Sequence, residues 1–238
     1  MSAPIVLVPG FWLGAWAWDE VAGLLRADGY EVTVLTLPGL QPGADAATVS
    51  LADHVDSIVH AIHAAGRPVV LVVHSGSGFP GYAATDRAPD RIAAAVYVDT
   101  GPGIGPMDAD FDAPTRPMPS PEQLAEEENL DGLSEDQLAT FQRRAVPEPG
   151  GVIRDKVALT NPARADVPTT VIATSFTSGE YKAYAREHHP SFLAGLDELH
   201  DVTWIDLPTS HWPMWSKPRQ LAALLGGIAA KAGQGSGS

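Results

Sequence analysis

The sequence predicts an α/β fold: a mostly parallel six-stranded sheet with helices on both faces and a helical cap insertion near the middle of the chain. Two observations carry this prediction. Short apolar runs alternate with longer helical patterns, and each run is apolar throughout, which is typical of strands covered on both faces. The alternation breaks only once, over residues 101–166.

Six apolar segments predict the strands, and the stretches between them predict the helices. Strands are expected at Ile5–Val8, Val32–Leu35, Val69–Val73, Ala94–Val98, Thr170–Ala173 and Val202–Ile205. Helices are expected at Trp18–Asp28, Thr48–Ala65, Gly81–Ala88, Tyr181–Leu199 and Lys217–Lys231. Because strands alternate with helices, the connections should be right-handed crossovers between parallel strands.

Residues 101–166, called here the insertion, carry no strand pattern. Their first third is rich in proline, and two short amphipathic helices follow near Pro121–Leu130 and Ser134–Val146. A segment of this length inside a compact domain is usually functional or disordered, and the helical patterns favour a cap or lid over the sheet. Residues 1–100 and 167–232 then form the core, and residues 233–238 are expected to be a flexible tail.

Most of the negative charge of the chain lies in this insertion. The formal net charge is −14, and residues 107–136 contain ten acidic side chains and a single basic one, Arg116. These acids form either a solvated outer face or a charge-selective lid.

Composition excludes several classes of protein. The chain has no cysteine, which rules out disulfides, thiolate metal sites and a cysteine nucleophile. An acidic chain is a poor match for the phosphate backbone of nucleic acid. The longest apolar runs, such as Val69–Val73, are far below the ~20 residues of a membrane span, and no signal peptide is recognisable before Ile5. We therefore expect a cytoplasmic monomer or homodimer.

A strand that ends on a small-residue turn marks the candidate nucleophile. The segment His74-Ser75-Gly76-Ser77-Gly78 follows an apolar strand and precedes a helical pattern. Such a turn strains the backbone of its serine and projects the hydroxyl from the carboxyl edge of the sheet. Ser75 fits best, with Ser77 as the alternative, and Val73 is larger than the glycine usual two residues before the nucleophile.

The first strand leads into a second glycine-containing turn, Val8–Trp16. If the second strand lies outside the first and the third lies inside it, strands one and three become neighbours at the point where open α/β sheets bind ligands. The backbone N–H groups of Phe11 and Gly76 would then both be able to stabilise an oxyanion.

A serine nucleophile needs a base and an acid that orients that base. His211 follows the last expected strand and is the best-placed histidine. Asp99 ends the fourth strand, next to the strand of the nucleophile. Glu180, Asp201, Asp206 or no acid at all remain alternatives. The pair His188-His189 lacks a carboxylate at helical ligand spacing, so neither a metal nor another cofactor is expected.

The sequence resembles the α/β-hydrolases, most of all the compact branch that contains plant methyl esterases, hydroxynitrile lyases and their bacterial esterase relatives. The resemblance rests on Pro9–Trp16, His74–Gly78 and Ser210–Pro213, and it spans nearly the whole chain apart from the insertion. It implies a nucleophile at Ser75, a base at His211 and oxyanion donors at Phe11 and Gly76.

The chain departs from the pattern of this branch at two places. The position after the penultimate strand, where the family acid usually lies, has no aspartate. An acid such as Asp99 is instead similar to that of fungal lactonases and dehalogenases. Pro9 replaces the histidine common before the first glycine of the oxyanion loop.

These features predict a serine hydrolase that cleaves a small or medium carboxylic ester or a lactone through an acyl-enzyme, without cofactor. A hydroxynitrile lyase, a cofactor-free oxygenase and a non-catalytic ligand receptor are the alternatives. Six apolar side chains are candidates for the substrate pocket between sheet and insertion: Trp12, Met107, Phe111, Phe141, Trp212 and Trp215.

Overall fold

A computed structural model describes residues 1–235 of the chain. Its six-stranded sheet is parallel throughout and has the order β2-β1-β3-β4-β7-β8, which confirms the predicted fold class and the neighbouring positions of strands one and three. The strands are β1 (Ile5–Val8), β2 (Val32–Val34), β3 (Val69–His74), β4 (Ile92–Val98), β7 (Thr169–Ala173) and β8 (Val202–Asp206).

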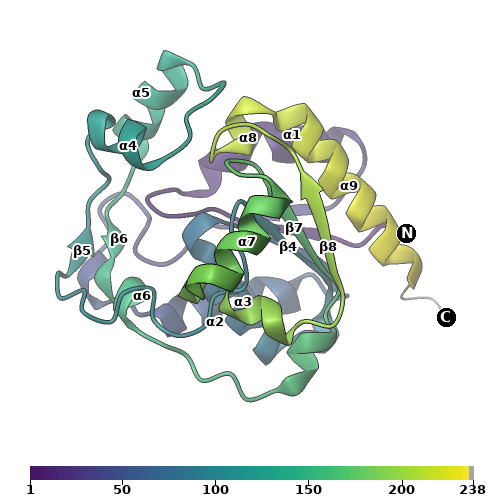
Figure 1. The fold of residues 1–238 in the computed structure, drawn as a ribbon. Coiled ribbons are helices and arrows are strands. Elements are labelled where there is room, and N and C mark those ends of the chain that lie inside the picture. The colour runs from purple at the N-terminus through teal and green to yellow at the C-terminus, as the bar shows by residue number, and fades with distance from the viewer. Residues whose placement is uncertain (236–238) are drawn as a thin grey trace.

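Helices cover both faces of this sheet because alternate strand residues point to opposite sides. Leu7, Val70 and Val96 pack in one apolar cluster with α1 (Asp19–Ala27) and α9 (Pro218–Gly235). Their neighbours along the strands pack in a second cluster with α2 (Leu51–Ala64) and α3 (Gly78–Arg87). Figure 1 shows these two pairs of helices on opposite sides of the strands.

The part of the insertion from β5 to α6 lies beyond one end of the sheet (Figure 1), whereas its last residues return to the other end, where β4 and β7 begin. It contains β5 (Thr115–Arg116), α4 (Pro121–Glu127), α5 (Glu135–Arg144), β6 (Glu148–Pro149), α6 (Gly150–Arg154) and the 3₁₀ helix η5 (Pro162–Asp166). The antiparallel pair β5–β6 corrects the expectation that this stretch has no strand. Strands of two residues are too short to leave an apolar pattern in a sequence.

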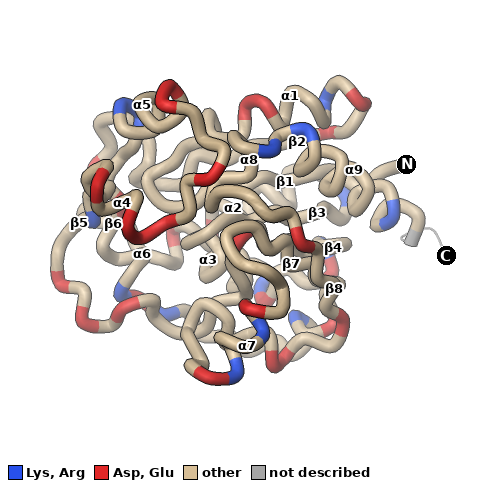
Figure 2. The backbone as a smooth tube through the Cα atoms, turned by 45° about the horizontal axis from the view of Figure 1, so that its top comes forward, with Lys and Arg blue, Asp and Glu red and all other residues tan. Residues whose placement is uncertain are grey.

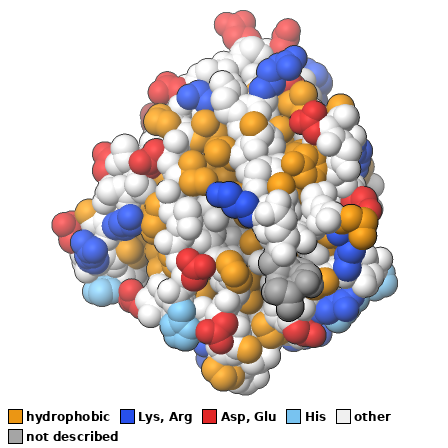
Figure 3. Space-filling model, turned by 90° about the vertical axis from the view of Figure 1, so that its right-hand side faces the viewer, with side chains coloured by type: hydrophobic (Ala, Val, Ile, Leu, Met, Phe, Trp, Pro, Cys, Tyr) orange, Lys and Arg blue, Asp and Glu red, His pale blue; other side chains and the backbone are white. Residues whose placement is uncertain are grey.

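Aspartate and glutamate residues, red on the backbone tube of Figure 2, gather around α4 and α5. The side of the molecule where α9 and β8 lie instead mixes acidic, basic and apolar side chains (Figure 3).

Two expected elements differ from the structure near the C-terminal end. The helix expected at Tyr181–Leu199 is divided into α7 (Ser178–His188) and the 3₁₀ helix η6 (Ser191–Glu198). The division falls at His189, which has φ 46° and ends α7, and at Pro190, which cannot donate a helical hydrogen bond. The expected tail began at residue 233, but α9 continues to Gly235; residues 236–238 lie outside the described residues.

Within residues 1–235, none of the helices is both long enough and apolar enough to cross a membrane.

Candidate active site

The turn after β3 holds Ser75 in the left-handed region of backbone space, at φ 52°. Non-glycine residues adopt this conformation rarely and usually where function requires it. Small neighbours make the turn possible: a Cβ on Gly10 would lie 2.8 Å from the Ser75 Cβ. Val73, which is larger than the usual glycine, packs directly against Gly81 of α3. A Cβ on Gly81 would lie only 2.6 Å from Val73 Cγ1, so the missing side chain of Gly81 leaves the room that Val73 needs.

His211 lies in the loop between β8 and the short helix α8 (Pro213–Ser216), and its Nε2 is 2.8 Å from the hydroxyl oxygen of Ser75. Two hydrogen bonds hold the backbone of His211 itself. The His211 N–H donates to the carbonyl oxygen of Asn129 in the insertion at 2.8 Å, and His74 Nε2 lies 2.7 Å from the His211 carbonyl oxygen. Burial lowers the pKa of His74 to about 3, so its ring is neutral and donates from Nε2.

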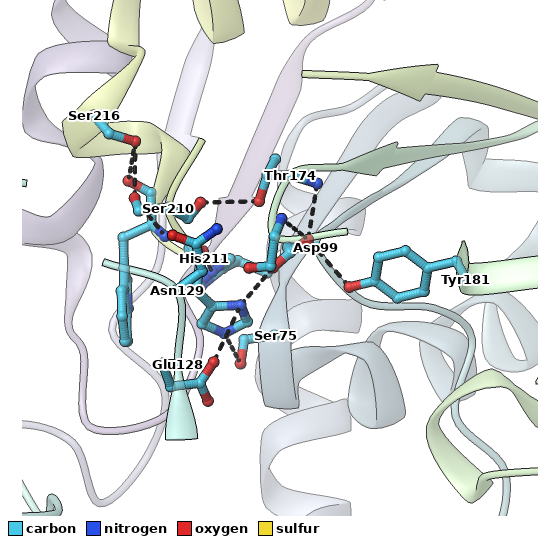
Figure 4. Close-up of polar contacts among 12 residues, drawn as sticks. Ser75, Asp99, Glu128, Asn129, Thr174, Tyr181, Ser210, His211 and Ser216 are labelled. Atoms are coloured by element: carbon cyan, nitrogen blue, oxygen red, sulfur yellow. Dashed lines mark hydrogen bonds and ion pairs between the residues drawn. The ribbon is translucent and has the colours of Figure 1, made fainter. Parts of the chain in front are cut away.

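Asp99 follows β4 and is bonded to the other side of the His211 ring, with Oδ2 2.6 Å from Nδ1 (Figure 4). Its backbone also has a positive φ, 48°. The side chain is 1 % exposed, and its oxygens accept further hydrogen bonds from Thr174 N, Ser175 N, Ser175 Oγ and the Tyr181 hydroxyl. Ser75, His211 and Asp99, which lie far apart in the sequence, thus form one continuous chain of hydrogen bonds.

The charges of Asp99 and His211 are set by two opposing effects: burial, which disfavours the charged form of each group, and the interaction between the two side chains, which favours it. Burial opposes ionisation of Asp99, but the hydrogen bonds from His211 and Ser175 and the nearby imidazolium hold the pKa of Asp99 well below its usual range. Burial lowers the pKa of His211, but the hydrogen bond and the negative charge of Asp99 outweigh it, so this pKa lies above its ordinary value. A buried carboxylate beside an imidazole favours uptake of a proton by the imidazole.

The alternative residues are engaged elsewhere. Ser77 Oγ donates to the Pro9 carbonyl oxygen. Glu180 accepts from Thr177 N and closes the N-terminal cap of α7, while Asp206 accepts from Ser178 N at 2.6 Å. Asp201 is exposed and immediately precedes β8, so it lies at the opposite end of this strand from His211.

The ring of Phe11 packs against the backbone of Gly76. A Cβ on Gly76 would lie 2.3 Å from Phe11 Cε1, so a larger residue at position 76 would require the Phe11 ring to move. No group among residues 1–235 accepts the Phe11 backbone N–H, which leaves this donor available. The next residue, Trp12, has φ 65°, and its N–H donates to Oε2 of buried Glu148 in β6.

A cavity of about 300 Å³ opens over Ser75 and His211. Among the six expected pocket residues, only Met107 lines it. Trp12, Phe141 and Trp212 are buried in the core, Trp215 stacks on Trp16 and Trp212, and Phe111 lies away from the cavity. The ring of Phe141 in α5 packs against Trp12, Trp212 and Trp215, so the bulk of these four side chains serves packing between the insertion and the core.

The sequence analysis did not find most of the walls of this cavity. They include Phe79, Glu128, Phe176, Tyr181 and Phe192. Phe176 could have been found, because it follows β7 at the same carboxyl edge as Ser75. Glu128 could not, because its place depends on the path of the insertion.

Among the residues that the structure describes, no group of three or more His, Asp or Glu side chains is arranged to hold a metal ion.

Comparison with known proteins agrees with this architecture. Esterase PIR7B from Oryza sativa subsp. japonica is 36 % identical over 98 residues, a match that spans 39 % of this chain and only 37 % of the esterase. Methylesterase 7 from Arabidopsis thaliana is 28 % identical over 257 residues, covering 95 % of this chain and 96 % of the relative.

Solved structures share the fold at lower identity. An extracellular alpha/beta-hydrolase from a Paenibacillus species, described as structurally and functionally homologous to Tobacco Salicylic Acid Binding Protein 2, has a TM-score of 0.75 at 23 % identity, with 95 % of this chain and 99 % of that chain covered. Tomato Methylketone Synthase I complexed with 2-tridecanone has a TM-score of 0.73 at 23 % identity, with 98 % and 99 % covered. The profile of the Alpha/beta hydrolase family matches residues 5–224, and the chain therefore belongs to that family.

Proposed function

We propose that the protein is a carboxylic ester hydrolase, acting on esters or lactones, with Ser75 as nucleophile, His211 as general base and Asp99 as the acid that orients His211. One observation carries the proposal: the hydrogen-bonded chain from Ser75 Oγ through His211 to Asp99 opens onto a cavity. Relatives named esterase and methylesterase support an ester as the substrate.

The chemistry follows from these positions. Ser75 Oγ attacks the carbonyl carbon of the ester while His211 Nε2 takes the hydroxyl proton. Asp99 keeps the Nδ1 proton of His211 in place and stabilises the imidazolium. The negative oxygen of the tetrahedral intermediate accepts hydrogen bonds from the N–H groups of Phe11 and Gly76. Collapse of the intermediate expels the alcohol, which takes the proton from His211.

Hydrolysis of the acyl-enzyme repeats the sequence with water. His211, neutral again, takes a proton from a water molecule, the resulting hydroxide attacks the acyl carbon, and Ser75 leaves with the proton returned by His211. The insertion acts as the cap in this proposal, because it supplies Met107 and Glu128 to the cavity and holds the backbone of His211 through Asn129.

A covalent label tests the proposal directly. The wild-type protein should hydrolyse p-nitrophenyl acetate and should react with a fluorophosphonate probe, with the adduct located on Ser75 by mass spectrometry. Ser75→Ala should abolish both reactions while the protein stays folded. Ser77→Ala is the matched control, since Ser77 lies in the same turn and should keep most of the activity. An adduct on Ser77, or full activity of Ser75→Ala, would refute the assignment.

A further inference from the structure

The wall of the cavity over Ser75 carries one carboxylate that the proposed chemistry does not use. Its acidic side chains are Asp99 and Glu128, and no lysine or arginine lines it in the described part of the chain. Asp99 is fully occupied by hydrogen bonds from His211, Thr174, Ser175 and Tyr181. Glu128 is therefore the group whose charge a bound molecule meets.

Among the described residues, no group donates a hydrogen bond to the carboxylate of Glu128. Within residues 1–235, its carboxylate makes a single contact with a basic group, 3.8 Å from His211 Nδ1, and that nitrogen is already bonded to Asp99 at 2.6 Å. Figure 4 shows Glu128 beside the His211 ring. Its side chain is 33 % exposed, which leaves it accessible from the cavity.

This carboxylate is also partly removed from water. Burial raises the pKa of Glu128, and the positive charge of His211 offsets this effect only in part. The charge of Arg116 acts in the same direction as that of His211, and burial still prevails. A partly desolvated carboxylate that accepts no hydrogen bond is costly, so a cation that reaches it is stabilised more than it would be at an exposed site.

The surroundings of the cavity suit an apolar cation. Phe176, Tyr181 and Phe192 also line a second cavity of about 550 Å³, which continues along α7 to Tyr184 and the carboxylates of Glu180 and Glu187. Aromatic faces attract cationic groups such as quaternary ammonium, and neighbouring carboxylates add to that attraction.

We propose that Glu128 determines the substrate charge that the enzyme accepts: it favours esters that carry a positively charged nitrogen close to the reacting carbonyl and disfavours esters that carry a carboxylate. This inference rests on the proposed ester hydrolysis and names the substrate class for the same cavity.

Three esters of similar size test the charge preference: 3,3-dimethylbutyl acetate, its cationic isostere 2-(trimethylammonio)ethyl acetate, and the anionic 3-carboxypropyl acetate. In Glu128→Gln, the ratio of kcat/KM for the cationic ester to that for the neutral ester should fall about five- to tenfold, and the ratio for the anionic ester should rise. Glu126→Gln, which removes an exposed charge of α4, should leave both ratios as in the wild type.

Two results would overturn the inference. If Glu128→Gln slowed all three esters equally, Glu128 would act on His211 and not on substrate charge. If both ratios stayed unchanged, the charge of Glu128 would have no effect on the binding or the reaction of the substrate.

A binding measurement separates this inference from the proposed hydrolysis. In the Ser75→Ala background, calorimetry should give a Kd for the cationic ester that Glu128→Gln weakens about five- to tenfold relative to the neutral ester. This measurement needs no turnover, so equal Kd changes for the two esters would refute the charge preference even if hydrolysis failed for another reason.

Discussion

Oε2 of Glu148 accepts a hydrogen bond from the backbone N–H of Trp12 at 3.1 Å, and so joins β6 of the insertion to the residue that follows Phe11. Two more bonds strengthen this junction. The Val146 N–H donates to the Trp12 carbonyl oxygen at 3.0 Å, and Trp12 Nε1 donates to the Arg116 carbonyl oxygen at 3.1 Å. Because Trp12 has a positive φ, its conformation depends on these partners.

Removal of the Glu148 acceptor should impair catalysis through the loop of Phe11. Glu148→Ala leaves the buried Trp12 N–H without a partner, and we expect kcat for p-nitrophenyl acetate to fall about tenfold or more with a smaller change in KM. Glu148→Gln keeps a neutral oxygen acceptor and should retain most of the wild-type kcat. Equal kcat values for the alanine variant and the wild type, with both folded by circular dichroism, would show that Glu148 does not position this loop.

The same side chain should make stability depend on pH. Complete burial raises the pKa of Glu148 from 4.5 to about 8, so between these values the folded protein holds a proton that the unfolded chain has lost. Stability from this group is present at low pH and declines as pH rises towards 8. We therefore compare the Tm of Glu148→Gln minus the Tm of the wild type at two pH values. This difference should be at least about 3 °C larger at pH 8.5 than at pH 5. A difference that is independent of pH would mean that Glu148 is ionised in the folded state.

Loss of the Asp99 charge should change both the rate and its pH dependence. Neutral His211 is the proposed base, so activity of the wild type should decline as pH falls through a pKa above 6.5. Asp99→Asn should lower kcat/KM by about 10³–10⁴ and move this acidic limb to lower pH. The charge of Asp99, which is the main influence that raises the pKa of His211, is then gone, while burial and the weaker effect of Glu128 remain. Asp206→Asn, at the end of β8, is the control and should stay active. The reverse pattern would assign the acid to Asp206.

The sequence predicted the sheet and the three residues of the hydrogen-bonded chain because these depend on local patterns. An apolar run followed by a small-residue turn identifies Ser75, and a strand that ends in an acid identifies Asp99. In a parallel sheet all such strand ends meet at one edge, so proximity follows from topology alone.

The cavity walls depend on contacts between distant segments and were harder to predict. Phe141 and Trp212 have the composition of pocket residues, yet their rings pack against each other at a centroid distance of 5.1 Å. Glu128 is one of many acids in its segment, and hydrogen bonds from the His211 loop to the carbonyl oxygens of Asn129 and Asp131 bring it to the cavity. No local pattern distinguishes it from its exposed neighbours Glu126 and Glu127.

Val73, the residue that departs most from the expected turn, should be energetically coupled to Gly81. A Cβ on Gly81 would lie 2.6 Å from Val73 Cγ1, so Gly81→Ala overfills the contact between β3 and α3 and should destabilise the protein by about 1–3 kcal/mol. Val73→Ala removes the colliding methyl groups, and the double variant should be more stable than the sum of the single effects by about 1 kcal/mol or more. Chemical denaturation of the four proteins measures this coupling. Additive effects would mean that the helix shifts freely, and that glycine at position 81 is not what accommodates valine in the turn.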